Sequence, residues 1–189
     1  GGNLYSSGAN VNYVIAIGYG SNVNTFGGDN LAIGRNANVT AQGSAIAIGG
    51  AANAAGDSGT AVGRAANAYG TSSTALGQNA YANVRSTAIG YRANASGVLA
   101  VALGQRANAS ADRSIVLGQR ANAFGLYSAV IGYRAQATAR NAVAIGNRAQ
   151  ANDSDTIVLG TSTINTNIAG VLSKGSGTFK IDHPLASKK

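Results

Sequence analysis

The sequence predicts an all-β fold, a parallel β-solenoid whose turns hold about fourteen residues each. A repeat this short cannot bury a hydrophobic face alone, so its copies must stack into one elongated domain. Alanine at every second position favours strands over helices, and no proline interrupts the repeats. The repeats are marked by glycines that each follow an aliphatic residue: Gly18, Gly34, Gly49, Gly63, Gly77, Gly90, Gly104, Gly118, Gly132, Gly146 and Gly160.

A first short strand is expected immediately before each of these glycines. The residue before the glycine is always Ile, Val or Leu, and we call these residues the aliphatic column. Adjacent strand residues point to opposite faces, so this strand is apolar on both faces and needs cover on both. One turn of the solenoid covers only one face, so we expect the aliphatic column, with Leu103 and Leu117, to form the core of the single chain. The residue two before the glycine, the small column, is then expected to face another subunit: Ala47, Ala61, Ala75, Ala88, Ala102, Val116, Val130, Ala144 and Val158.

A second, half-exposed strand is expected after each glycine. Residues 92–95, Arg-Ala-Asn-Ala, show the pattern, in which alanines alternate with polar residues. We expect the alanines to face the core and the arginines and asparagines to face water. A second turn then follows, and we expect a positive φ at its glycine. Such glycines are Gly56, Gly70, Gly97 and Gly125.

Composition and period divide the 189 residues into three parts. Residues 1–30 break the period and are predicted to form capping, irregular rungs, while residues 31–160 form the regular array. Residues 161–189 hold all four lysines and are predicted to be a linker and tail that lead to a further domain. No stretch approaches the ~20 apolar residues of a membrane helix, and the start does not resemble a signal peptide. We therefore expect an excised extracellular segment that contacts a membrane only through parts outside this chain.

The repeats resemble the head repeats of trimeric autotransporter adhesins of the YadA type. The likeness rests on residues 44–49, Ser-Ala-Ile-Ala-Ile-Gly, followed by Ala52-Asn53-Ala54 and a glycine, and on the same pattern from residue 87. It covers roughly residues 14–161. The resemblance implies a left-handed parallel β-roll, three of which pack in parallel around one axis that the small column would line. It also implies binding to a host matrix or cell surface.

A second resemblance concerns the tail. Residues 177–185, Gly-Thr-Phe-Lys-Ile-Asp-His-Pro-Leu, resemble a segment of phage tail-fibre proteins that can precede a carboxy-terminal chaperone domain. No heptad pattern of a stalk follows Gly160. The preferred interpretation is therefore a trimeric segment of a virion tail fibre that attaches to a host surface. The alternatives are the head of a bacterial surface adhesin and a purely structural spacer.

The most suggestive surface feature is a column of arginines two residues after the glycine. Guanidinium groups bind carboxylates and phosphates bidentately, so the column suits anionic glycans or lipopolysaccharide phosphates on a host surface. The preferred explanation of the column by itself is a solvated face that opposes aggregation. The tyrosines one residue after the glycine are candidate platforms for sugar rings or cross-strand packing. The candidate surface residues are Arg92, Arg106, Arg120, Arg134 and Arg148, with Tyr91 and Tyr133.

Other functions have little support in the sequence. The chain has one histidine, no cysteine, six acidic residues and no phosphate-binding loop, so we expect no enzyme, cofactor or metal site. Residues 153–155, Asp-Ser-Asp, are expected to form a turn rather than a calcium site. The formal charge of +8 could attract nucleic acid, but the sequence shows no recognition helix, so we expect no nucleic-acid partner. A threonine ladder typical of ice binding spans only three rungs, at Thr60, Thr74 and Thr87.

Overall fold

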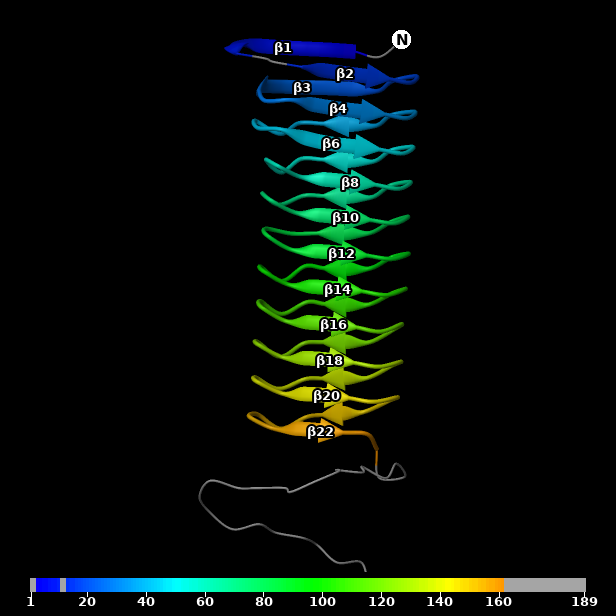
Figure 1. Ribbon diagram of the computed structural model, residues 1–189, viewed down its shortest axis with the longest axis vertical. Coiled ribbons are helices and arrows are strands. Elements are labelled where there is room, and N and C mark those ends of the chain that lie inside the picture. The colour runs from blue at the N-terminus through cyan, green and yellow to red at the C-terminus, as the bar shows by residue number, and fades with distance from the viewer. Residues whose placement is uncertain (1–2, 11–12, 162–189) are drawn as a thin grey trace, which may run out of the picture.

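The structure is a computed structural model that describes residues 3–10 and 13–161. These residues form two eleven-stranded parallel sheets and no helix. Successive strands alternate between the sheets, so each turn of the chain adds one strand to each sheet (Figure 1). The prediction of an all-β parallel solenoid is confirmed. Among the described residues, no helix is long and apolar enough to span a bilayer.

The two sheets are named here by the numbering of their strands. The odd sheet contains β1 (Asn3–Asn10), β3 (Asn22–Gly27), β5 (Asn38–Val39), β7 (Asn53–Ala54), β9 (Asn67–Ala68), β11 (Tyr81–Ala82), β13 (Asn94–Ala95), β15 (Asn108–Ala109), β17 (Asn122–Ala123), β19 (Gln136–Ala137) and β21 (Gln150–Ala151). The even sheet contains β2 (Val14–Ile17), β4 (Asn30–Ile33), β6 (Ala45–Ile48), β8 (Thr60–Val62), β10 (Thr74–Leu76), β12 (Thr87–Ile89), β14 (Val101–Leu103), β16 (Ile115–Leu117), β18 (Ala129–Ile131), β20 (Val143–Ile145) and β22 (Ile157–Leu159).

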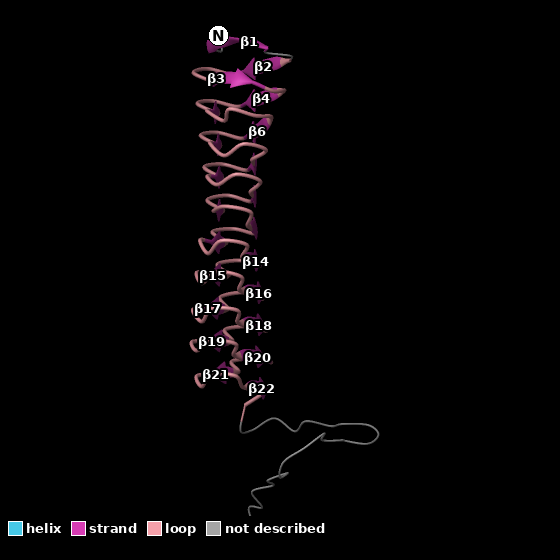
Figure 2. Cartoon of the chain, turned by 90° about the vertical axis from the view of Figure 1, so that its left-hand side faces the viewer, coloured by secondary structure: helices cyan, strands magenta, loops and turns pink. Residues whose placement is uncertain are grey.

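The rod is a left-handed coil. Even strands run to the right in Figure 1 and lie in front of the odd strands, as Figure 2 shows from the side, while the chain descends. Eleven strands at a spacing of ~4.7 Å give the rod a length on the order of 50 Å.

Equivalent residues of successive rungs pair in register. Ala102, for example, pairs with Ala88 and Val116. The glycine at the end of each even strand keeps the rungs this close: at Gly104 φ is +136°, and a Cβ would lie 2.6 Å from the carbonyl oxygen of Gly118. A side chain there would clash with the next rung, so only glycine fits at this turn.

The core of the single chain is made of the small column, which corrects the sequence-based expectation. Alanines of the odd strands, such as Ala109, meet the small column between the sheets and have no exposed surface. The interior of a fourteen-residue rung is narrow, so it admits alanine, serine and an occasional valine. The fully buried members are Ala47, Ala61, Ala75, Ala88, Ala102, Val116, Val130 and Ala144, and Val158 is partly buried.

The aliphatic column points away from the core, so its assignment as the core of the chain was wrong. Leu103 and Leu117 are only partly buried, and Ile131 is 41 % exposed. Both faces of the even strands are apolar, as expected, but the bulky face is the outer one. Any cover for the even sheet must therefore meet the aliphatic column.

The second turn also differs from its prediction. The glycine of this turn has no positive φ in the rungs of Gly56, Gly70, Gly97 and Gly125. The left-handed residue comes two positions later instead, at Ser58 in one of these rungs, with φ of 56°. The glycine is needed for space, since a Cβ on Gly70 would lie 2.1 Å from the backbone nitrogen of Val84.

The ends of the rod differ from the regular array. Strands β1 and β3 are longer than later odd strands, and their pairing shifts register between Ser6 and Asn10. Of the predicted linker and tail at 161–189, residues 162–189, which include the segment 177–185, lie outside the described residues.

Candidate functional site

The largest candidate surface is the outer side of the even sheet, which we call the apolar face. Two columns of side chains form it: the aliphatic column and the residues two positions earlier in the same strands. Exposed members include Ile89 at 40 %, Ile115 at 44 % and Ile157 at 69 %. The earlier column carries the three threonines of β8, β10 and β12, which pair with one another. A parallel sheet is normally covered on both faces, so this uncovered face is suited to packing against another protein chain.

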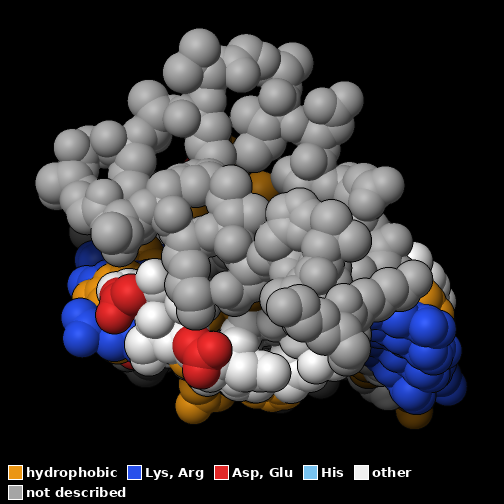
Figure 3. All heavy atoms as spheres, turned by 90° about the horizontal axis from the view of Figure 1, so that it is seen from below, with side chains coloured by type: hydrophobic (Ala, Val, Ile, Leu, Met, Phe, Trp, Pro, Cys, Tyr) orange, Lys and Arg blue, Asp and Glu red, His pale blue; other side chains and the backbone are white. Residues whose placement is uncertain are grey.

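The five candidate arginines form an arginine stripe along one edge of the rod: Arg92, Arg106, Arg120, Arg134 and Arg148. All five side chains are exposed, and Figure 3 shows basic side chains stacked at that edge. The prediction that they face water is confirmed. Their expected position on the second strand is wrong, because each lies in the turn before that strand, with φ between 54° and 58°.

Backbone hydrogen bonds align the stripe from rung to rung. The amide of Arg106 donates to the carbonyl of Tyr91 at 2.8 Å, and the amide of Arg120 donates to that of Gln105 at 2.9 Å. Equivalent arginines are therefore about 4.8 Å apart at the backbone. Like charges stacked along one edge of the rod repel one another. Within the described residues no carboxylate pairs with the stripe, so a bound anion would relieve this repulsion.

Two tyrosines support arginines of the stripe rather than standing as separate platforms. The guanidinium carbon of Arg92 lies 5.2 Å from the ring centroid of Tyr91. The same distance separates Arg134 from Tyr133. A cation over a ring face is attracted by the ring quadrupole, so each tyrosine holds its neighbour in place.

An asparagine ladder on the outer side of the odd sheet was not singled out from the sequence. The Asn22 amide donates to the side-chain oxygen of Asn38 at 2.9 Å, and the ladder continues through Asn53 to Asn67. Tyr81 occupies the next position and interrupts the ladder, which resumes where the Asn94 amide donates to the side-chain oxygen of Asn108 at 2.9 Å. Asparagine repeated in one column was the available signal, since in-register stacking satisfies such amides.

Residues 153–155 form the expected turn. Thr156 donates its hydroxyl to the carbonyl oxygen of Asp153 at 2.6 Å. The Asp155 carboxylate accepts a hydrogen bond of 2.7 Å from the Asn141 amide. The first bond closes the turn itself, and the second ties Asp155 to the corresponding turn of the preceding rung. The described part of the chain contains no cluster of three acidic, histidine or cysteine residues that would hold a metal ion.

Comparison with known families agrees with this geometry. The model of the YadA head domain repeat, two copies long, matches residues 43–66, 54–80, 68–93, 82–107, 95–121, 109–135, 123–149 and 137–163. Together these matches span 43–163, or 121 of the 189 residues. No protein with curated annotation matches the chain. The register of the rungs and the matched repeats lead to one assignment: the chain belongs to the YadA head domain repeat family.

Proposed function

We propose that this chain is the head of a homotrimeric bacterial surface adhesin that attaches to a host matrix or cell surface. The observation that carries the proposal is the uncovered apolar face, which runs along a family-matched rod. An adhesin head of this kind works by presenting a long binding surface, and it needs no catalytic centre.

The apolar face supports the oligomeric part of the proposal. Its isoleucines, valines and leucines repeat in register, so an identical chain offers a complementary surface at the same height. Three parallel chains around one axis cover all three faces and leave no further face open, as closed cyclic symmetry requires. The small column contributes nothing to this contact because it is buried inside each chain.

The arginine stripe supports the binding part of the proposal. A left-handed backbone favours glycine and asparagine, and two earlier rungs do carry Asn36 and Asn79 at equivalent turns. Arginine gains nothing from this backbone conformation, yet five successive rungs use it. A trimer would present three stripes, each suited to the carboxylates or sulfates of an anionic glycan.

Two other contexts remain as alternatives with different consequences. A virion tail fibre would use the same β-roll, but the prediction depends on residues 177–185, which lie outside the family match and the described residues. A structural spacer would form the same trimer and bind nothing. Binding by the isolated trimer separates an adhesin from a spacer.

The test combines assembly with binding. Sedimentation velocity of the full chain should give a trimer, and surface plasmon resonance should show binding to immobilised heparin as a model polyanion. The triple variant Arg106→Gln, Arg120→Gln, Arg134→Gln should remain a trimer and bind heparin more weakly. A stable monomer at micromolar concentration refutes the oligomeric part. A trimer that binds neither heparin nor matrix proteins nor host cells supports the structural spacer instead.

A further inference from the structure

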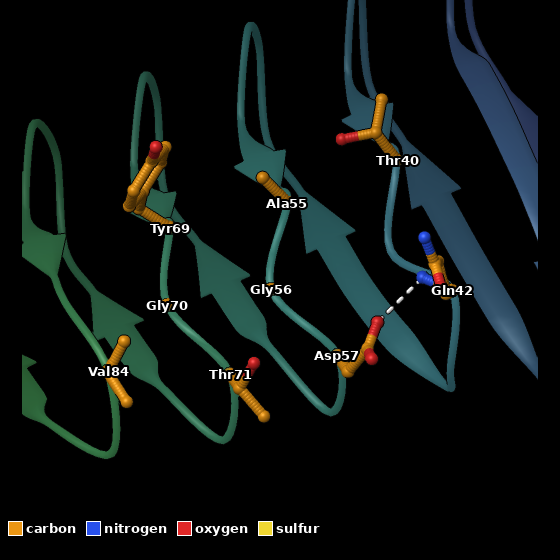
Figure 4. Close-up of a pocket in the computed structure, with 9 residues that line it drawn as sticks. All are labelled: Thr40, Gln42, Ala55, Gly56, Asp57, Tyr69, Gly70, Thr71 and Val84. Carbon is orange, nitrogen blue, oxygen red and sulfur yellow. Dashed lines mark hydrogen bonds between the residues drawn. The ribbon is translucent and has the colours of Figure 1, made fainter.

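A groove on the far side of the rod from the apolar face is not used by the surfaces described above. It lies where β5, β7 and β9 lead into the second turn, and its volume is about 540 Å³ (Figure 4). Pockets for small ligands commonly have volumes of this order. Its lining combines an aromatic ring, hydroxyl groups, an amide and one carboxylate: Thr40, Gln42, Asp57, Tyr69 and Thr71, with Val84 at one end.

Unequal turns create this groove. In each rung a connection leads from the last paired residue of the odd strand to the first position of the even strand that is paired in all four rungs. In four successive rungs this connection has six, five, five and four residues: 40–45, 55–59, 69–73 and 83–86. The longest connection therefore stands at one end and the shortest at the other. Gly56 and Gly70 line the groove between them as bare backbone, and a Cβ on Gly56 would lie 2.0 Å from the Gly70 carbonyl oxygen.

The groove carries a flat aromatic wall. Tyr69 is 59 % exposed, and its ring stacks on that of Tyr81 in the next rung, with centroids 6.3 Å apart and an angle of 22° between planes. Tyr69 follows the buried Ala68, so its side chain lies on the outer side of the odd sheet. It therefore stays accessible when the apolar face is covered. The electron-rich face of such a ring attracts the partly positive C–H groups of a sugar.

Polar groups around the wall have free hydrogen-bonding capacity. The Asp57 carboxylate accepts bonds through one oxygen from the backbone amides of Gln42, at 2.6 Å, and Gly43, at 3.0 Å. Its second oxygen has no partner among the described residues, and the same holds for the hydroxyls of Thr40 and Thr71. Two backbone amides thus fix the carboxylate while leaving an acceptor for a ligand hydroxyl group.

We propose that this groove binds an uncharged hexopyranose ring of a host glycan. The ring would stack on Tyr69 while its hydroxyl groups bond to Asp57 and the threonines. Asp57 is the only charged residue lining the groove, so the groove disfavours sialylated or sulfated sugars. The arginine stripe has the opposite preference, and the two sites therefore recognise different parts of a host surface. This inference stands independently of anion binding by the stripe.

The test uses saturation-transfer NMR on the full chain with four probes: lactose, maltotriose, N,N′-diacetylchitobiose and 3′-sialyllactose. At least one neutral probe should bind, and Tyr69→Ala should weaken that binding by about tenfold. Tyr69→Phe keeps the ring and should bind nearly as well as the parent. Phe124→Ala removes an exposed aromatic ring from the equivalent position after β17, outside the groove, so it is the matched control and should leave binding unchanged.

Charge selectivity gives a second readout. Asp57→Asn keeps an oxygen for the two backbone amides but removes the charge, so 3′-sialyllactose should bind more strongly relative to lactose. The triple arginine variant should bind neutral probes normally, which separates failure of this site from failure of the proposed anion binding. No transfer to any neutral probe overturns the inference. Equal binding by Tyr69→Ala and the parent, with both proteins showing the same thermal unfolding, overturns it as well.

Discussion

Ala102 and Leu103 are adjacent in β14 and lie on opposite sides of the even sheet: Ala102 is fully buried inside the chain, while Leu103 reaches the outer surface. The same division holds in each rung of the array. A single strand therefore serves two packing tasks, the interior of its own chain through the small residue and a contact between chains through the bulky one. Substitutions at these neighbours should have separable effects.

Leu103→Arg should disrupt the trimer. The proposed trimer would place three arginines in one buried layer without partners, which is strongly unfavourable. Sedimentation velocity should show monomers or a concentration-dependent mixture, while circular dichroism still reports β structure. Asn108→Arg, on the outer side of the odd sheet, adds the same charge and should leave the trimer intact. An unchanged trimer in Leu103→Arg would place the interface elsewhere.

Ala102→Leu should destabilise the fold of each chain. The space between the sheets is filled by alanines, so three extra carbon atoms force the rungs apart at a cost of about 1–3 kcal/mol or more. Thermal unfolding measures this as a lower transition temperature. Gln150→Leu introduces the same side chain at an exposed site and should have little effect. Equal behaviour of the two variants would contradict the assignment of the small column to the core.

Arg106→Gly and Arg106→Val test the left-handed turn of the stripe. Glycine adopts φ of 57° without steric cost, so Arg106→Gly should be neutral or slightly stabilising in the folded chain. Valine is β-branched, so Arg106→Val should lower the free energy of unfolding by about 1–2 kcal/mol. Equilibrium unfolding in denaturant compares the two variants. A stable Arg106→Val would show that the turn does not require this backbone conformation.

The triple variant Arg106→Gln, Arg120→Gln, Arg134→Gln should bind heparin with a flatter salt dependence than the parent. Each lost cation removes part of a screened electrostatic attraction, and exposed substitutions should barely change stability. The matched control is Arg85→Gln, Arg113→Gln, Arg140→Gln, which removes three arginines outside the stripe. If both triple variants weaken binding equally, net charge rather than the stripe is responsible.

Gly104→Ala should loosen the rod locally. The added Cβ meets the Gly118 carbonyl at 2.6 Å, so the rungs on either side must separate. Stability in a repeat array comes largely from nearest-neighbour contacts, and distant rungs should keep their protection. Hydrogen exchange resolved by peptide should therefore show faster exchange around residues 90–120 and little change near residues 34–50. Uniform loosening along the rod would mean that it unfolds as one cooperative unit.

The repeat, the parallel pairing and the two-sided apolar strand can all be predicted from the order of the residues. A glycine every fourteen residues and alternating alanines leave few other arrangements, and Ala93 and Ala95 do lie inside as predicted. The exposure of the arginines also followed from the pattern. These features depend on the alternation of small, bulky and polar residues along each strand, which the sequence shows directly.

Which face of the even strand lies inside can be seen only in the folded chain. Alternation separates Ala102 from Leu103 but assigns neither to the core, and the narrow gap between two closely packed sheets then selects the smaller side chain. The left-handed backbone of Arg106 likewise depends on a hydrogen bond to the rung before it. The groove beside Tyr69 arises because connections of unequal length meet in space. Such features depend on the distances between neighbouring rungs, and these distances are set only when the chain has folded and its rungs have stacked.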